Sequence, residues 1–281
     1  MTRQEIREEI KDRLQKVGIE DFEYESWIFL EWMLGVDRGE YLMDPRKEVP
    51  PESCHQLEEM LVQREKRAPL QYLMGTCEFM GYPFKVDERV LIPRQDTECL
   101  VELAAAYIQR EKEKKRLRIL DLCTGSGCIG ISIQLLCPET EVVLSDLSAD
   151  ALEVAGENAR TLGAEVVLKQ GDLFSSVEGK FDYILSNPPY IPTEVIRGLM
   201  PEVREYEPEM ALDGAADGLY FYRKIIKEAG QYLNPGGFVL FEIGQEQGED
   251  LRKLFHDGGF VETEIKKDLA GLDRIAVGRK K

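Results

Sequence analysis

From about Leu117 onward the chain alternates between short apolar runs and helical patterns, and this alternation constrains the fold more than any other feature. Parallel strands need a crossover connection, usually a helix, so the pattern is typical of a parallel sheet with helices on both faces. We predict strands at 118–122, 141–145, 165–169, 183–186 and 238–243, a final strand pair at 261–266 and 274–277, and helices at 128–136, 149–162, 219–233 and 247–256. Ligands of such α/β sheets bind at the carboxyl ends of the strands, which is where functional residues are expected.

Residues 1–75 have a different, helical pattern. Thr2 and Glu5 form a capping box ahead of an apolar helical repeat. A second helix is expected from about Phe22 to Leu34 with Gly35 closing it, and a third, opened by Pro50-Pro51, to about Lys66. A small packed helical module and a recognition module are both compatible with this part of the sequence.

Residues 76–95 are typical of a β-hairpin connector. We therefore divide the chain into a helical domain at 1–75, a connector at 76–95 and an α/β domain at 96–281. Asp96 or Thr97 is expected to cap the helix that follows the connector. Arg94, just before that cap, is a candidate clamp for an anion or a carbonyl group, or alternatively a surface residue.

The first predicted strand leads into a glycine-rich turn. Glycines at a strand-to-helix turn let a ligand approach the backbone closely. The spacing also matches the dinucleotide fingerprint, but the Asp121 carboxylate beside the turn would repel a pyrophosphate and would suit a cationic ligand. The predicted cofactor-binding residues of this turn are Asp121, Cys123, Thr124, Gly125, Ser126 and Gly127.

Acidic residues also follow the next two predicted strands. Asp146 stands where an acidic side chain bonds ribose hydroxyls. Asp172 is expected to accept from the exocyclic amine of adenine, with Leu173 or Phe174 against the ring. Each residue alone is more often a cap or a turn residue, but together with the glycine turn they indicate a nucleoside site with a positive centre, which fits the sulfonium of S-adenosylmethionine.

The strand at 183–186 ends in Asn187-Pro188-Pro189-Tyr190. Proline fixes φ and has no N–H, so neither a helix nor a central strand can continue through this turn. The turn offers an amide side chain, backbone carbonyls and an aromatic face, which suit a flat NH2-bearing group. The same tetrapeptide is also compatible with a rigid loop that has no chemical role.

Composition excludes several classes of protein. The formal net charge is −17, and the only basic run, at 110–118, is interrupted by Glu111 and Glu113, so a solvated face is expected there rather than a nucleic-acid footprint. Six cysteines without a C-x-x-C pair and only two histidines argue against a metal site and fit free thiols in a reducing cytoplasm. No apolar run is long enough to cross a bilayer, and the charged first residues are not those of a signal peptide.

These motifs together resemble the HemK/PrmC family of release factor glutamine methyltransferases, within the class I S-adenosylmethionine-dependent methyltransferases. The resemblance covers essentially the whole chain and rests on three motifs in addition to the acidic strand ends. They are Ile92-Pro93-Arg94-Gln95-Asp96-Thr97-Glu98, Asn187-Pro188-Pro189-Tyr190-Ile191-Pro192, and Ala211-Leu212-Asp213-Gly214 followed by Asp217-Gly218. The chain departs from the usual pattern at Cys123, where glycine is commoner, at Gln95, where proline is usual, and at Leu173, where an aromatic residue can occur.

The resemblance implies a Rossmann-like seven-stranded domain joined by the hairpin to an all-α domain that helps to grip the substrate. It implies methyl transfer from S-adenosylmethionine, which leaves S-adenosylhomocysteine, to the glutamine of the Gly-Gly-Gln motif in class I peptide chain release factors, and thus a role in translation termination. We expect a cytoplasmic monomer that binds neither nucleic acid nor membrane. The resemblance also implies catalytic roles for Asn187, Pro188, Pro189 and Tyr190, which with Arg94 would bind the substrate.

The expected roles are specific. Asn187 Oδ1 and the Pro188 carbonyl each accept one N–H of the substrate amide, Tyr190 stacks over that amide, and Pro189 keeps the turn rigid. Asn187 also borders the cofactor. The alternatives are a nucleic-acid amino-methyltransferase that shares the Asn-Pro-Pro-Tyr motif, a nicotinamide-dependent dehydrogenase, and a noncatalytic binding protein that keeps the fold.

Overall fold

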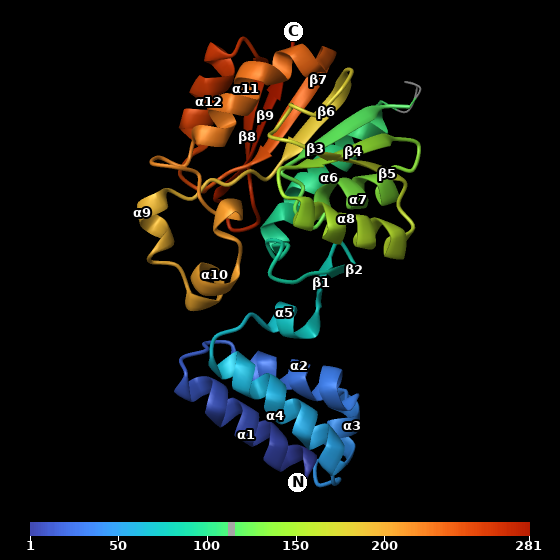
Figure 1. The fold of residues 1–281 in the computed structure, drawn as a ribbon, viewed down its shortest axis with the longest axis vertical. Coiled ribbons are helices and arrows are strands. Elements are labelled where there is room, and N and C mark those ends of the chain that lie inside the picture. The colour runs from blue at the N-terminus through green and yellow to red at the C-terminus, as the bar shows by residue number, and fades with distance from the viewer. Residues whose placement is uncertain (112–115) are drawn as a thin grey trace. The chain divides into compact units, whose positions relative to one another are not determined.

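The computed structural model describes residues 1–111 and 116–281. The chain separates into two compact units, Met1–Met74 and Gly75–Lys281, which Figure 1 shows in ribbon form. The basic run at 110–118 includes residues 112–115, which lie outside the described residues. Within the described residues no helix is long and apolar enough to span a membrane.

The first unit consists of helices around a small apolar core. The capping box at Thr2 and the left-handed Gly35 at the end of the second helix are both confirmed. Two short helices were not predicted, because six and five residues are too few to show a helical repeat. The helices are α1 (Arg3–Lys16), α2 (Phe22–Leu34), α3 (Arg38–Met43), α4 (Pro51–Glu65) and α5 (Leu70–Met74).

The second unit begins with a two-stranded hairpin and continues into a seven-stranded sheet. The hairpin pairs β1 (Thr76–Phe79) with β2 (Tyr82–Lys85) in antiparallel register. In the sheet the strand order is β5-β4-β3-β6-β7-β9-β8. The strands are β3 (Arg118–Leu122), β4 (Glu141–Asp146), β5 (Val166–Gln170), β6 (Phe181–Ser186), β7 (Leu233–Glu242), β8 (Val261–Lys267) and β9 (Asp273–Arg279).

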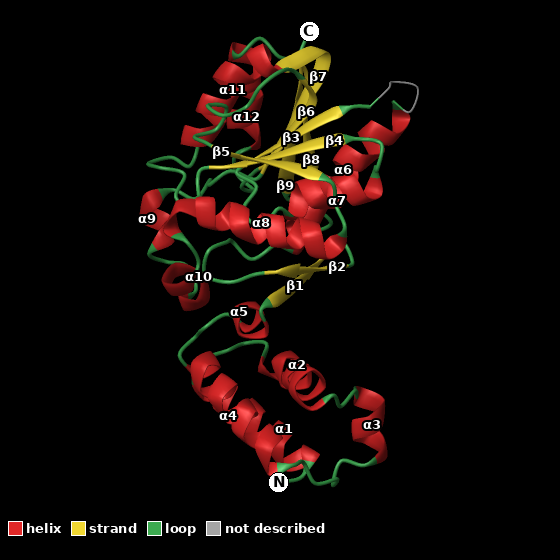
Figure 2. Cartoon of the chain, turned by 45° about the vertical axis from the view of Figure 1, so that its right-hand side comes forward, coloured by secondary structure: helices red, strands yellow, loops and turns green. Residues whose placement is uncertain are grey.

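Helices cover both faces of this sheet, as Figures 1 and 2 show. One face packs on α6 (Gln95–Arg110), α7 (Cys128–Leu136) and α8 (Ala149–Leu162). The other face packs on α11 (Tyr220–Tyr232) and α12 (Gly248–Asp257). The first five strands of the order are parallel, and β9 returns antiparallel to β7. The predicted Rossmann-like sheet is thus confirmed, and the carboxyl ends of β3, β4, β5 and β6 meet at one edge.

One prediction about local structure is wrong. Neither Asp96 nor Thr97 caps the connector helix, because α6 begins at Gln95 with Arg94 at the N-cap, so both residues lie inside its first turn. The stretch between β6 and α11, for which the sequence predicts no element, contains α9 (Thr193–Ile196), α10 (Pro201–Tyr206) and the 3-10 turn η1 (Glu209–Ala211). These pieces are too short for a period to be visible in the sequence.

Candidate active site

The glycine-rich turn after β3 is anchored by the side chain of Asp121, which is completely buried. Its Oδ2 accepts from Thr124 Oγ1 at 2.5 Å and from the Gly130 backbone N–H at 3.0 Å. Burial raises the pKa of this carboxyl group to about 7. A side chain at Gly130 would place its Cβ 2.2 Å from Leu144 Cδ2 and 3.1 Å from Asp121 Cβ. Glycine is therefore required there for the turn to pack against the sheet.

Cys123 adopts the left-handed backbone conformation, with φ at +56°. This region costs a residue with a side chain roughly 1–2 kcal/mol, and glycine avoids the cost. The geometry explains physically why glycine would suit this position. Desolvation raises the pKa of the Cys123 thiol. The thiol therefore stays neutral and lines the site without acting as a nucleophile.

The acidic strand ends occupy different environments. Asp146 accepts from the Gly125 N–H and the Ser148 N–H, both at 2.9 Å, and burial raises its pKa. It therefore joins the glycine turn to the start of α8. Asp172 is more than half exposed and pairs with Lys224 of α11 at 3.1 Å.

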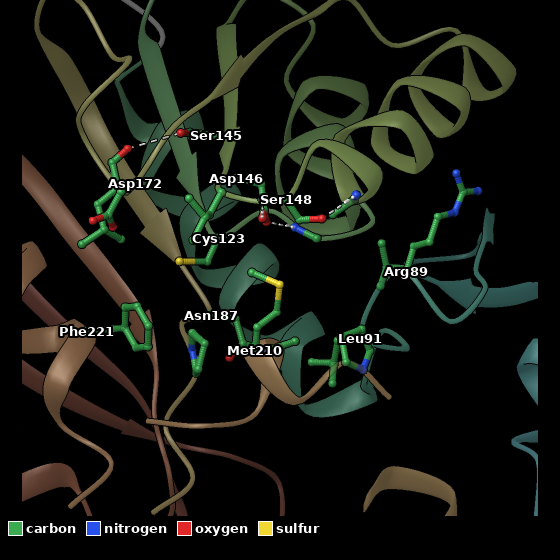
Figure 3. Close-up of a pocket in the computed structure, with 18 of the residues that line it drawn as sticks. Arg89, Leu91, Cys123, Ser145, Asp146, Ser148, Asp172, Asn187, Met210 and Phe221 are labelled. Atoms are coloured by element: carbon green, nitrogen blue, oxygen red, sulfur yellow. Dashed lines mark hydrogen bonds between the residues drawn. The ribbon is translucent and has the colours of Figure 1, made fainter. Parts of the chain in front are cut away.

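A cavity opens at the sheet edge between these strand ends and the proline turn (Figure 3). In that view Cys123, Asp146 and Asp172 lie on the sheet side, and Asn187 lies across from them with Met210 and Phe221. Polar and backbone atoms on one side thus face apolar side chains on the other. The cavity is lined by Arg89, Val90, Leu91, Cys123, Gly125, Ser145, Asp146, Leu147, Ser148, Ala151, Gly171, Asp172, Leu173, Asn187, Pro189, Pro208, Met210, Ala211 and Phe221.

Asn187 borders a second, smaller cavity as well, which contains Arg94 and Thr97 of the α6 start. The two cavities share Leu91, Cys123, Gly125 and Asn187. Asn187 Nδ2 donates to Thr97 Oγ1 at 3.4 Å. Its other amide atom, Oδ1, therefore remains available as an acceptor at the junction of the cavities.

Tyr190 is anchored to β7 through its hydroxyl. Its hydroxyl donates to Glu242 Oε1 at 3.2 Å, and its ring packs against the core of the α11 face. Burial beside Glu242 raises the pKa of the Tyr190 phenol. In the described structure neither Tyr190 nor the buried Pro188 lines the two cavities, whereas Pro189 lines the larger one.

The segment that follows Tyr190 packs closely against the Tyr190 backbone. A Cβ at Gly214 would lie 2.7 Å from Tyr190 Cα, and one at Gly218 would lie 2.2 Å from the Tyr190 carbonyl oxygen. Gln247 Nε2 donates to that same oxygen at 3.1 Å. The Asp-Gly motifs noted in the sequence thus allow this segment to pack directly on the proline turn.

Arg94 is bound to the same segment. Its guanidinium pairs with Glu207 at 2.5 Å, and the Glu207 side chain is only 1% exposed while that of Arg94 is 39% exposed. Burial raises the pKa of Glu207, and the Arg94 charge opposes the shift. Arg94 therefore holds the residues just before Pro208, Met210 and Ala211, which wall the larger cavity.

The structure brings most of the predicted site residues to one place. Ten of the fourteen line one cavity or the other: Arg94, Cys123, Thr124, Gly125, Ser126, Asp146, Asp172, Leu173, Asn187 and Pro189. Asp121 lies beneath the turn as its anchor, and Gly127 is the N-cap of α7. Four residues at the site are not predicted from the sequence. Met210 and Phe221 carry no signal in the sequence. For Thr97 and Glu242 the only signal is a polar residue beside an apolar run.

The cavity fits a cationic nucleoside ligand better than a pyrophosphate. Two backbone N–H groups of the glycine turn are already used, since Gly125 N–H donates to Asp146 and Gly127 N–H donates to the Thr124 carbonyl. Gly125 leaves open space where a side chain would stand. Among the basic side chains described at this site, Arg89 is bound in a fork to Asp87, Arg94 pairs with Glu207 and Lys224 pairs with Asp172. None of these described cations is left unpaired to receive a phosphate.

Comparison with known proteins gives two matching family models. Residues 5–75 match the PrmC N-terminal domain, and residues 102–198 match the methyltransferase small domain. Among solved structures, the hMettl16 catalytic domain in complex with the MAT2A 3′UTR hairpin 6 superposes with a TM-score of 0.57 at 13% identity, covering 82% of each chain. The Thermus thermophilus 16S rRNA N2 G1207 methyltransferase, solved with AdoMet and guanosine, gives 0.51 at 14% identity, covering 73% of this chain and 50% of the other. At these identities the structures show the fold alone.

Curated relatives extend over nearly the full length. The release factor glutamine methyltransferase of Geobacter sulfurreducens is 41% identical, covering 95% of this chain and 92% of its own. That of Clostridium acetobutylicum is 39% identical, covering 94% and 93%, and that of Moorella thermoacetica is 40% identical, covering 97% and 96%. Because this similarity spans the helical unit, the hairpin and the seven-stranded sheet, the chain belongs to the release factor glutamine methyltransferase family.

Proposed function

We propose that the junction of the two cavities at Asn187 is where a release factor glutamine receives a methyl group on its side-chain nitrogen. The observation that supports this most is the orientation of Asn187, whose Nδ2 is turned to Thr97 so that Oδ1 remains for a substrate N–H. When bound in the larger cavity, S-adenosylmethionine supplies an electrophilic methyl group on a sulfonium. Asp146 would hold its ribose, and Asp172 and Leu173 its adenine.

The chain's task is to make an amide nitrogen react, although its lone pair is delocalised. Asn187 Oδ1 accepts one N–H of the substrate amide, which aims the nitrogen and stabilises the positive charge that grows on it. The buried Pro188 lines neither cavity, so the turn would have to shift for its carbonyl to accept the second N–H. The bound cofactor would supply the methyl carbon to the substrate nitrogen, with its sulfonium sulfur as the leaving group, and the nitrogen would release one proton to water. Tyr190 supports the turn from behind through Glu242, so stacking over the amide would require its ring to move.

The partner is a class I release factor that presents its Gly-Gly-Gln loop, and the helical unit at 1–75 contributes to gripping it. Such a partner places the enzyme in the cytoplasm, where translation terminates. The acidity of the chain, with a formal net charge of −17, favours a protein partner over bare nucleic acid. We propose that the enzyme acts as a monomer.

The test is incubation with S-adenosylmethionine and a release factor, followed by peptide mass measurement. We expect a gain of one methylene on the Gly-Gly-Gln glutamine and none on RNA or DNA incubated in parallel. Asn187→Ala should lower turnover about a hundredfold or more, as the loss of a hydrogen bond to developing charge does, while cofactor affinity falls only a few-fold. The matched control is Asn234→Ala, since Asn234 bonds Asp182 in the described structure and lines neither cavity. Full activity in Asn187→Ala would refute the assigned role.

A further inference from the structure

A buried asparagine of α8 joins two segments that line the cavities. Asn158 is 2% exposed, and in the part of the chain that the structure describes it lines neither cavity itself. We propose that Asn158 is a positioning residue that fixes the glycine turn against the connector and so shapes the place where the cofactor binds. The inference rests on the proposed function, because the cofactor is the ligand of that place.

The Asn158 side chain makes three hydrogen bonds to backbone groups. Its Oδ1 accepts from the Lys85 N–H at 2.7 Å, and its Nδ2 donates to the Lys85 carbonyl at 3.1 Å and to the Ser126 carbonyl at 2.9 Å. One acceptor next to two N–H donors is what a carboxamide offers and what no other kind of side chain offers. These partners also fix the direction of the amide, since a backbone N–H only donates and a carbonyl only accepts.

On the connector side, Asn158 fixes the end of β2. Figure 2 shows β2 next to α8, and Asn158 bonds both backbone groups of Lys85 as a neighbouring strand would. The chain then makes a tight turn in which the N–H of the buried Val90 donates to the Asp87 carbonyl at 3.1 Å. The residues that follow line the smaller cavity, namely Leu91, Pro93 and Arg94. The bonds at Lys85 therefore hold the start of that wall.

On the other side, Asn158 holds the glycine turn at Ser126, which also lines the smaller cavity. The backbone N–H four residues further on, that of Gly130, donates to Asp121 at 3.0 Å, so Asn158 supplies the donor for the Ser126 carbonyl. Ser126 is only 2% exposed, and the glycines on either side of it have φ values of +55° and +83°. Glycine backbone is free to adopt many conformations, so this part of the turn depends on bonds from outside it.

A single amide thus connects two walls of the smaller cavity. Without it, the turn and the connector are free to separate, and the arrangement that binds the cofactor is populated only part of the time. The apparent Kd then rises by the inverse of that fraction. The linkage also works in the other direction, because a cofactor that orders the turn at Ser126 makes the opening of the Asn158 bonds to Lys85 rarer.

The first experiment measures the Kd of S-adenosylhomocysteine by calorimetry in Asn158→Leu, which keeps a similar volume and removes all three bonds. We expect the Kd to rise about 10- to 50-fold, as the loss of buried hydrogen bonds at a binding site does. The matched control is Asn234→Leu, because Asn234 bonds Asp182 and lines neither cavity among the described residues. Its Kd should stay within about threefold of the wild-type value.

The second experiment measures backbone amide exchange at Lys85 with and without saturating S-adenosylhomocysteine. In the wild-type protein we expect the ligand to slow exchange at Lys85 at least about threefold more than at Val277, a buried residue of the remote strand β9. In Asn158→Leu this excess should disappear, although the ligand is still bound. A purely structural loss of stability would change both amides alike and leave their ratio unchanged.

The outcomes are decisive for each idea. A Kd in Asn158→Leu within about threefold of the wild-type value, or no excess protection of Lys85 in the wild-type protein, would overturn the positioning role. If Asn158→Leu does not fold, the wild-type exchange comparison decides alone. If the wild-type protein shows the excess protection but transfers no methyl group to a release factor, the proposed function fails and the positioning role of Asn158 stands.

Discussion

Arg94→Ala tests whether the Arg94–Glu207 pair holds the wall of the cofactor cavity closed. The substitution leaves the Glu207 carboxylate, only 1% exposed, without its guanidinium. Removing one partner of a buried ion pair costs about 3–5 kcal/mol. Because Arg94 is 39% exposed, its charge is partly screened by solvent, and we expect Arg94→Ala to cost about 2–3 kcal/mol. The carboxylate can avoid that cost by reaching water, which requires the chain around α10 and η1 to open.

Hydrogen exchange of backbone amides measures this opening directly. Two protected amides in the affected stretch are Val203, which donates to Met200, and Ala211, which donates to Pro208. A cost of about 2–3 kcal/mol corresponds to exchange that is roughly 30- to 150-fold faster there. Amides of the central strand β3, which do not depend on this pair, should exchange at the wild-type rate.

A double-mutant cycle isolates the pair. In a Glu207→Gln background the buried charge is gone, so adding Arg94→Ala should change exchange by no more than about threefold. Equal acceleration in both backgrounds, or none in the wild-type background, would refute the reasoning. A raised KM for the release factor with unchanged exchange would assign Arg94 to substrate binding alone.

Three further predictions concern stability. Gly130→Ala should lower the free energy of unfolding by about 1–3 kcal/mol in a urea titration, because its Cβ would lie 2.2 Å from Leu144 Cδ2; an unchanged midpoint would contradict the packing. Since burial raises the pKa of Asp121 from 3.8 to about 7, the folded protein holds that proton at pH values where the unfolded chain has lost it. Stability should therefore fall as the pH rises from about 4 to about 7 and level off above, and Asp121→Asn should flatten this part of the pH profile. Glu25→Ala removes the carboxylate to which Arg64 donates two bonds of 2.8 Å inside the helical unit, and should cost about 3 kcal/mol in thermal unfolding, against little change for the exposed Glu31→Ala.

Regular elements with a clear period were predictable. The strand at Arg118–Leu122 and the helices at 128–136 and 149–162 have the predicted bounds. Each carries its own signal, since apolar periodicity and the cap residues depend on neighbours along the chain. The acidic strand ends and the glycine turn were recognisable for the same reason, because a parallel sheet brings the carboxyl ends of its strands to one edge.

The structure of the region between β6 and α11 could not be predicted from local patterns. Its helices have only a few residues each, and their positions depend on contacts with distant groups, such as Glu207 with Arg94 across 113 positions of sequence. Met210, at the end of this region, lines the cavity because the region packs on the proline turn. No local pattern encodes such contacts.

By itself, the sequence determined the order of the longer elements, the class of sheet and the chemical nature of the residues at the strand ends. These depend on residue types and on spacings of two to four positions, which are local properties of a chain. Only the tertiary structure decided that Thr97 lies inside a helix with its hydroxyl on Asn187, and that Tyr190 turns to Glu242 and not to the cavity. A hydrogen bond is set by where side chains meet in space, and residues separated by 90 and 52 positions meet only once the sheet has formed.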